Sequence, residues 1–83
     1  MTNIIDSPAH YAIHNIEPIT FIMGNNLPFW KGNIIKYCMR AGYKHYDGQD
    51  SVESEITDLM KVIRYAEMRI NTLEGRSPSH DDE

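Results

Sequence analysis

The C-terminal half of the chain has the most regular alternation of apolar and polar positions. From residue 51 to residue 74, apolar side chains recur at intervals of four and three residues, which is the heptad repeat of helices that pack side by side. The repeat consists of Val52, Ile56, Leu59, Ile63, Ala66, Ile70 and Leu73. Asp50 and Glu53 are spaced as in a capping box, and Gly75 is typical of a helix end. We therefore predict a long helix over residues 51–74.

A second amphipathic helix is predicted over residues 29–42. Its apolar side chains Ile34, Cys38 and Ala41 share one face at about 100° per residue. We expect this face to be buried and Cys38 to be a structural thiol. Gly32 within the helix indicates the close approach of another backbone or of a ligand, or a frayed first turn. The opposite face holds polar and aromatic side chains, namely Asn33, Lys36, Tyr37, Arg40 and Lys44.

A short first helix is predicted over residues 16–23, with Asn15 as its cap and Gly24 as its end. The preceding residues form an N-terminal arm, and residues 76–83 are expected to be a disordered acidic tail. Together these elements predict an all-α fold with one helical domain over residues 1–75.

Length and composition predict an oligomer. The chain has 83 residues and a formal net charge of -4, and a core of this size is marginal for a lone chain. We expect a homo-oligomer that forms through the long third helix. Cys38 is the sole cysteine, which excludes an internal disulfide and fits a reducing compartment. The start resembles no signal peptide and no apolar run reaches the roughly 20 residues of a membrane span, so we expect a cytoplasmic protein without a membrane partner.

The acidic total conceals a segregation of charge. Residues 18–46 contain four basic side chains and no Asp or Glu, whereas residues 47–58 contain five acidic side chains and no Lys or Arg. The acidic total argues against non-specific nucleic-acid binding, while the basic segment leaves room for a small anionic ligand.

The polar face of the second helix is the first candidate site. Lys36, Arg40 and Lys44 supply cations for phosphate groups, and the guanidinium of Arg40 is a planar fork that matches phosphate oxygens. Tyr37 could stack on a base, and Asn33 could read its edge. The alternative is a solvated face, or a face paired with the acidic loop and the third helix.

Carboxylates and histidines form the other candidates. Glu55 and Asp58 lie one helical turn apart, a spacing that can hold Mg²⁺ together with substrate phosphates, but such pairs also occur on ordinary exposed helices. His10 could act as an acid and, with Tyr11, contact a phosphate, or both could pack beneath the arm. His45 could likewise act in acid–base chemistry or contact a phosphate, or it could have only a packing role. The sequence contains no P-loop motif, so phosphate binding would rely on side chains and helix ends.

Several ordered motifs carry a family resemblance. They are S-P-A-H-Y at residues 7–11, I-E-P-I at 16–19, G-N-I-I-K-Y-C-M-R-A-G-Y-K at 32–44 and D-L-M-K-V-I-R-Y at 58–65. In this order they resemble a family of small bacteriophage proteins of unknown function. Val62 stands where that family usually has alanine, the acidic loop before Asp58 is extended, and the chain is shorter than the members described as kinases.

The resemblance implies a phage protein that binds nucleotides in the host cytoplasm. Some members of the family are described as nucleotide kinases that act on nucleoside monophosphates without a P-loop. For this chain that implies phosphotransferase activity. The resemblance assigns no role to individual residues; from their chemistry we expect His10 and Asp58 to be catalytic and Glu55 and Asp58 to hold Mg²⁺. The motif positions are His10, Tyr11, Glu17, Asn33, Lys36, Tyr37, Arg40, Lys44, Asp58 and Lys61.

Two other functions remain open. A non-catalytic oligomeric binder would sequester a nucleotide or engage a host protein. An all-α Mg²⁺-dependent nucleoside triphosphate pyrophosphohydrolase would need several helix-borne carboxylates, and the sequence offers one clear pair with Glu17 as a distant third. A site on one helix is small, so we expect the arm with His10 and Tyr11, or a second subunit, to complete it.

Overall fold

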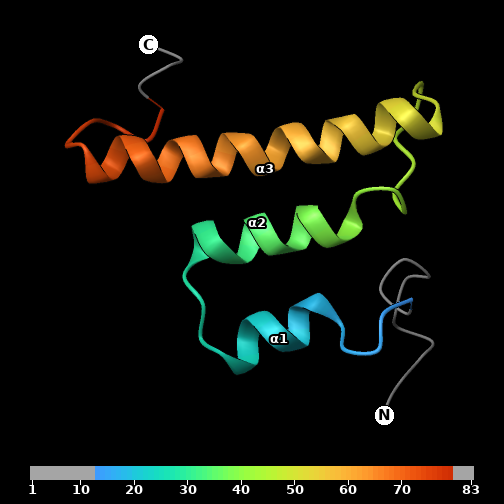
Figure 1. Cartoon of the computed structure of the whole chain (residues 1–83), viewed down its shortest axis with the longest axis horizontal. Coiled ribbons are helices and arrows are strands. Elements are labelled where there is room, and N and C mark those ends of the chain that lie inside the picture. Colours follow the sequence, from blue (N-terminus) through green and yellow to red (C-terminus); the bar gives the residue numbers. More distant parts are fainter. Residues whose placement is uncertain (1–12, 80–83) are drawn as a thin grey trace.

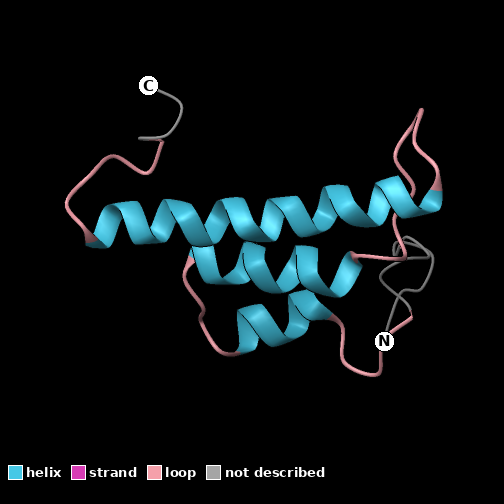
Figure 2. Ribbon diagram, turned by 45° about the horizontal axis from the view of Figure 1, so that its top comes forward, coloured by secondary structure: helices cyan, strands magenta, loops and turns pink. Residues whose placement is uncertain are grey.

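The computed structural model of the chain describes residues 13–79 and contains three helices. They are α1 (Pro18–Gly24), α2 (Phe29–Arg40) and α3 (Ser51–Leu73), and no strand occurs among the described residues. The predicted all-α fold with three helices is confirmed. In both views α2 lies between α1 and α3, so the helices form one layer (Figures 1 and 2).

The helix ends follow local hydrogen bonds. Asp50 accepts a bond from the Glu53 amide at 2.7 Å, and the Glu53 side chain accepts one from the Asp50 amide at 2.8 Å, so the predicted capping box is present. The prediction that Asn15 caps α1 is wrong. Glu17 holds the N-cap position without a side-chain cap, and Pro18 begins the helix, where its fixed φ and missing N–H are tolerated.

The interface between α2 and α3 is polar and aromatic. Ser54 and Asp58 of α3 are fully buried, and the ring of Tyr37 on α2 stacks on Tyr65 of α3 with ring centroids 5.9 Å apart. The basic face of α2 therefore turns toward α3. Consequently the prediction of a buried thiol is wrong, because Cys38 lies on the outer side of α2 and is exposed.

The contact between α1 and α2 depends on Gly32. This glycine is the buried residue of α2, and a Cβ at its position would lie 2.9 Å from the Cγ2 methyl of Ile22. The group that approaches Gly32 is therefore an apolar side chain of α1, and neither the backbone nor the ligand that the sequence suggested.

No hydrophobic side chain is fully buried in the part of the chain that the structure describes. The heptad face of α3 points away from α2: Ile56, Ile63 and Ile70 are each about half exposed. No described helix is both long and apolar enough to cross a membrane.

Candidate functional site

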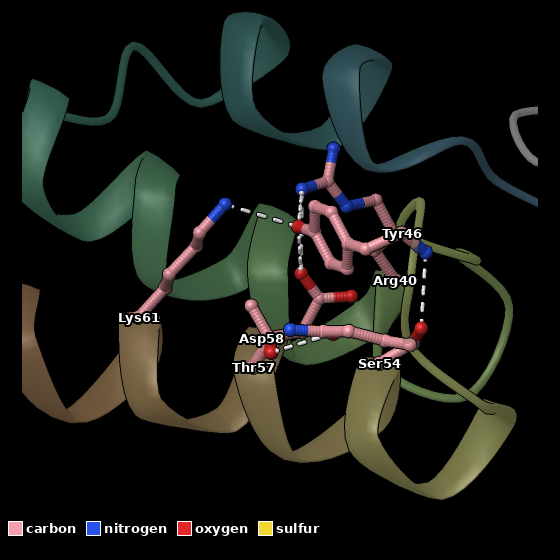
Figure 3. Close-up of polar contacts among 7 residues, drawn as sticks. Arg40, Tyr46, Ser54, Thr57, Asp58 and Lys61 are labelled. Atoms are coloured by element: carbon pink, nitrogen blue, oxygen red, sulfur yellow. Dashed lines mark hydrogen bonds and ion pairs between the residues drawn. The ribbon is translucent and has the colours of Figure 1, made fainter.

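The buried carboxylate of Asp58 is the centre of a polar network between α2, α3 and the loop that joins them (Figure 3). Asp58 Oδ1 accepts a hydrogen bond from the Tyr46 hydroxyl at 2.6 Å and pairs with Arg40 Nη2 at 3.3 Å. The same hydroxyl accepts bonds from Arg40 Nη2 at 2.5 Å and from Lys61 Nζ at 3.0 Å. One donor and two lone pairs are then all used, so the hydroxyl of Tyr46 is fully satisfied.

The connecting loop places Tyr46 in this network. Its backbone amide donates to Ser54 Oγ at 3.0 Å, which fastens the loop to the first turns of α3. Thr57 Oγ1 donates to Gln49 Oε1 at 2.9 Å and fixes the far side of the loop. Gly42 has a φ of 93°, a left-handed conformation that lets the chain leave α2 and turn back toward α3.

The network shifts the pKa values of two cations and leaves two of its buried polar atoms without a hydrogen-bond partner among the described residues. Burial lowers the pKa of Arg40, but the hydrogen bond and charge of Asp58, with a contribution from Tyr46, outweigh it and raise that pKa above its ordinary value. The hydrogen bond to Tyr46 raises the pKa of Lys61. Asp58 Oδ2 and Arg40 Nε are buried without a hydrogen-bond partner among the described residues, so the network keeps one spare acceptor and one spare donor.

Cations surround two tyrosine rings beside this network. Lys36 Nζ lies 5.2 Å and Lys61 Nζ 4.9 Å from the ring centroid of Tyr37. Lys61 Nζ lies 4.7 Å and Lys44 Nζ 5.5 Å from that of Tyr46. Such cation–π contacts hold lysines near an apolar surface without neutralising their charge. The four cations Lys36, Arg40, Lys44 and Lys61 therefore gather around the rings of Tyr37 and Tyr46. We call these four residues the cationic cluster.

A cavity of about 540 Å³ opens against the cationic cluster. Its lining is polar and combines the loop with one face of α3: Lys44, His45, Tyr46, Asp47, Gln49, Thr57 and Lys61. Lys44 and Lys61 reach it from different elements, and the Tyr46 ring lies near both ammonium groups. The arrangement suits a small anion, because two compact cations and several hydrogen-bonding groups converge on one space.

The structure brings together most of the predicted phosphate-binding residues. Lys36, Tyr37 and Arg40 lie in the cationic cluster and Lys44 lies at its edge. Asn33 instead donates to the carbonyl oxygen of Phe29, one turn earlier in the same helix. The sequence left open whether the polar face of α2 binds phosphate, is solvated, or pairs with the acidic loop and the third helix. For Arg40 the structure shows pairing with α3, through Asp58. The predicted residues His10 and Tyr11 lie outside the described residues.

The predicted Mg²⁺ ligands differ in their surroundings. Asp58 is fully buried and engaged with Arg40 and Tyr46, whereas Glu55 is exposed, with its carboxylate near Gly42. Within residues 13–79, no group of three or more His, Cys, Asp or Glu side chains is placed to hold a metal ion. Glu55 and Asp58 remain the predicted ligands.

Sequence reasoning named Asp58 and Lys61, but it missed the central role of Tyr46 and the contacts that Ser54 and Tyr65 of α3 make with the loop and with α2. A signal for the α3 partners exists in the sequence. Ser54, Asp58, Lys61 and Tyr65 recur at intervals of four, three and four residues, parallel to the apolar repeat on the other side of the helix. Tyr46 lies in a loop, where no periodicity indicates the direction of its side chain.

The fold and the site define a small all-α protein with a cationic, tyrosine-lined cavity. The sequence profile of the DUF3310 family, described as a protein of unknown function, matches residues 5–67. Because the match covers most of the chain, the chain belongs to this family. No curated protein and no solved structure matches it.

Proposed function

We propose that this chain is a bacteriophage nucleotide-binding protein that holds the phosphate groups of its ligand in the cavity between Lys44 and Lys61. The observation that carries the proposal is the convergence of these two lysines, from the loop and from α3, on one polar space. The phage origin rests on the motif resemblance, as does the choice of a nucleotide among phosphate-bearing ligands. The host cell cytoplasm is the corresponding location.

The residues of the site divide into two roles. Arg40 is paired with the buried Asp58, so its charge is largely used inside the protein and it orients the Tyr46 hydroxyl. Lys44 lines the cavity and has no ion pair among the described residues. We therefore assign phosphate binding to Lys44 and Lys61, and the positioning of the loop to Arg40 and Asp58.

Two versions of this function differ in whether phosphoryl transfer follows binding. In the kinase version, catalysis comes mainly from positioning and charge stabilisation. Lys44 and Lys61 would neutralise phosphate oxygens, Glu55 and Asp58 would hold Mg²⁺, and His10 would act as the acid. In the non-catalytic version, the protein sequesters a nucleotide and needs only the cavity. The engagement of Asp58 with Arg40 favours the second version, and it disfavours a pyrophosphohydrolase, which needs several free carboxylates.

Calorimetric titration with a panel of nucleoside mono- and triphosphates tests binding. Lys44→Met should weaken the affinity for the best ligand about 10- to 100-fold, because a charged hydrogen bond to phosphate is lost while the aliphatic stem is kept. Lys31→Met is the matched control, since Lys31 lies on α2 over the Trp30 ring and away from the cavity. Binding that is absent for every nucleotide, or equal in both variants, would exclude the proposal.

A coupled kinase assay then separates the two versions. The native protein is incubated with Mg²⁺, ATP and each nucleoside monophosphate that binds. Turnover that falls in Lys44→Met supports the kinase version. Binding without turnover leaves the sequestering protein, or one that presents the nucleotide-bound form to a host protein.

A further inference from the structure

We infer that the exposed heptad face of α3 is the contact surface for a second copy of this chain, in a parallel two-stranded coiled coil. The face consists of Val52, Ile56, Leu59, Ile63, Ala66, Ile70 and Leu73. Apart from the small Ala66, each of these side chains is between 41% and 67% exposed. The α3 helix has 23 residues and is therefore about 34 Å long, so the repeat offers a continuous apolar surface over three heptads.

No part of the chain within residues 13–79 covers this face. The residues of α3 that are buried lie on the other side of the helix: Ser54, Asp58 and Asn71. At about 100° per residue, the centre of that buried side is opposite the heptad face. Since the described part of a single chain has no fully buried hydrophobic side chain, a second surface is needed to remove these groups from water.

The side chains at the repeat favour two parallel strands. If Ile56, Ile63 and Ile70 are the a positions, the d positions are Val52, Leu59, Ala66 and Leu73, of which two are leucine. Isoleucine at a with leucine at d is the combination that favours parallel dimers over trimers and tetramers. If α3 instead bound a protein with an unrelated surface, its contact would not require isoleucine at the a positions and leucine at d positions.

The charges that flank the repeat also favour the parallel orientation. In this register Arg69 is a g position and Glu74 is the e position of the following heptad. In the single chain Arg69 lies over the Trp30 ring and Glu74 pairs with Arg76, so in a parallel pair they would exchange these contacts for each other. In an antiparallel pair centred on Ile63 and Ala66, Glu53 would instead face Glu74 of the second copy, which is repulsive. The exposed Met60 at an e position widens the apolar surface near its middle.

The inferred dimer leaves the cationic cluster free. Asp58 and Lys61 face α2, so the cavity opens on the side of α3 away from the second copy. Each dimer would therefore have two separate cavities, and neither would be shared between subunits. This differs from the sequence-based expectation that a second subunit completes the site.

Cysteine cross-linking tests both the contact and its orientation. In a Cys38→Ser background, Ile56→Cys and Ile70→Cys are prepared as single variants and oxidised mildly. In a parallel dimer, the introduced cysteine of one chain lies opposite the same cysteine of the second chain. Most chains of either variant should therefore run as covalent dimers on a non-reducing gel. Thr72→Cys is the matched control, because Thr72 is exposed on α3 but lies off the heptad face, and it should remain monomeric on the gel.

Three results would overturn the inference. The native protein could sediment as a monomer at concentrations well above those of the cross-linking experiment. It could sediment as a trimer or a larger assembly. Alternatively, single variants could stay unlinked while a chain with both Ile56→Cys and Leu73→Cys is linked between copies, which indicates antiparallel helices. Circular dichroism of each variant confirms that its helices are formed.

Discussion

At the scale of single residues, one tyrosine hydroxyl organises the site. The Tyr46 hydroxyl joins Arg40, Asp58 and Lys61, which come from two helices. Asp58 has no exposed surface, and a buried carboxylate is tolerated only when charged or polar partners compensate for the lost hydration. The hydroxyl of Tyr46 supplies the shortest of those bonds to Asp58.

Removing this hydroxyl should destabilise the protein. We expect Tyr46→Phe to lower the free energy of unfolding by about 1–3 kcal/mol. The buried carboxylate of Asp58 loses a hydrogen bond that water does not restore. Urea unfolding at one fixed chain concentration measures the loss. Tyr43→Phe is the control, since Tyr43 is 61% exposed, and it should change stability by less than about 0.5 kcal/mol. Equal effects of the two substitutions would contradict the role of Tyr46.

At the scale of helices, periodicity predicted which residues share a face but not which face turns inward. The grouping of Lys36, Tyr37 and Arg40 was correct, as was the heptad face of α3. The burial of Cys38 was predicted wrongly, because the rule that apolar faces turn inward assumes that the chain covers its own apolar surface. In this structure α2 and α3 meet through Tyr37, Arg40 and Asp58. Cys38 on α2 and the isoleucines of the heptad face on α3 are exposed.

The contact between α1 and α2 can be tested at Gly32. Alanine normally stabilises a helix interior by about 1 kcal/mol relative to glycine. At this position its methyl group would meet the Ile22 Cγ2 methyl at 2.9 Å, so either the Ile22 side chain or the two helices must shift. Overpacking of this kind costs about 1–3 kcal/mol. We expect Gly32→Ala to lower the free energy of unfolding by up to about 2 kcal/mol.

Gly24 provides the comparison for this substitution. It is the last residue of α1, and a Cβ there would have no neighbour within 4 Å. Gly24→Ala should therefore leave stability unchanged or raise it slightly, as measured by urea unfolding under the same conditions. If Gly32→Ala proved as stable as Gly24→Ala, the close packing of α1 on α2 would be contradicted.

At the scale of the whole molecule, the described chain is a thin layer of helices. Its extents are 43 × 34 × 17 Å and its radius of gyration is 14.7 Å, against about 12 Å for a compact domain of this length. One side of α3 is the apolar heptad face, and its other side lies next to the cationic cluster. The short length and the heptad repeat predicted an oligomer, and the sequence also places Ser54, Asp58 and Lys61 on the other side of the helix. The structure adds that α2 and the loop pack on that polar side.

The separation of the two faces predicts how stability depends on concentration. If a second copy covers the heptad face, folding and association are linked by mass action. A hundredfold dilution should then lower the melting temperature of the native protein by about 5–10 °C. Ile63→Asp places a charge in the middle of the face and should abolish both the dimer in sedimentation and the cooperative melting transition seen by circular dichroism. Ser51→Asp adds the same charge at an exposed position off the heptad face, and should retain both. A melting temperature independent of concentration, with an unchanged assembly in Ile63→Asp, would show that α3 is stable without a second copy.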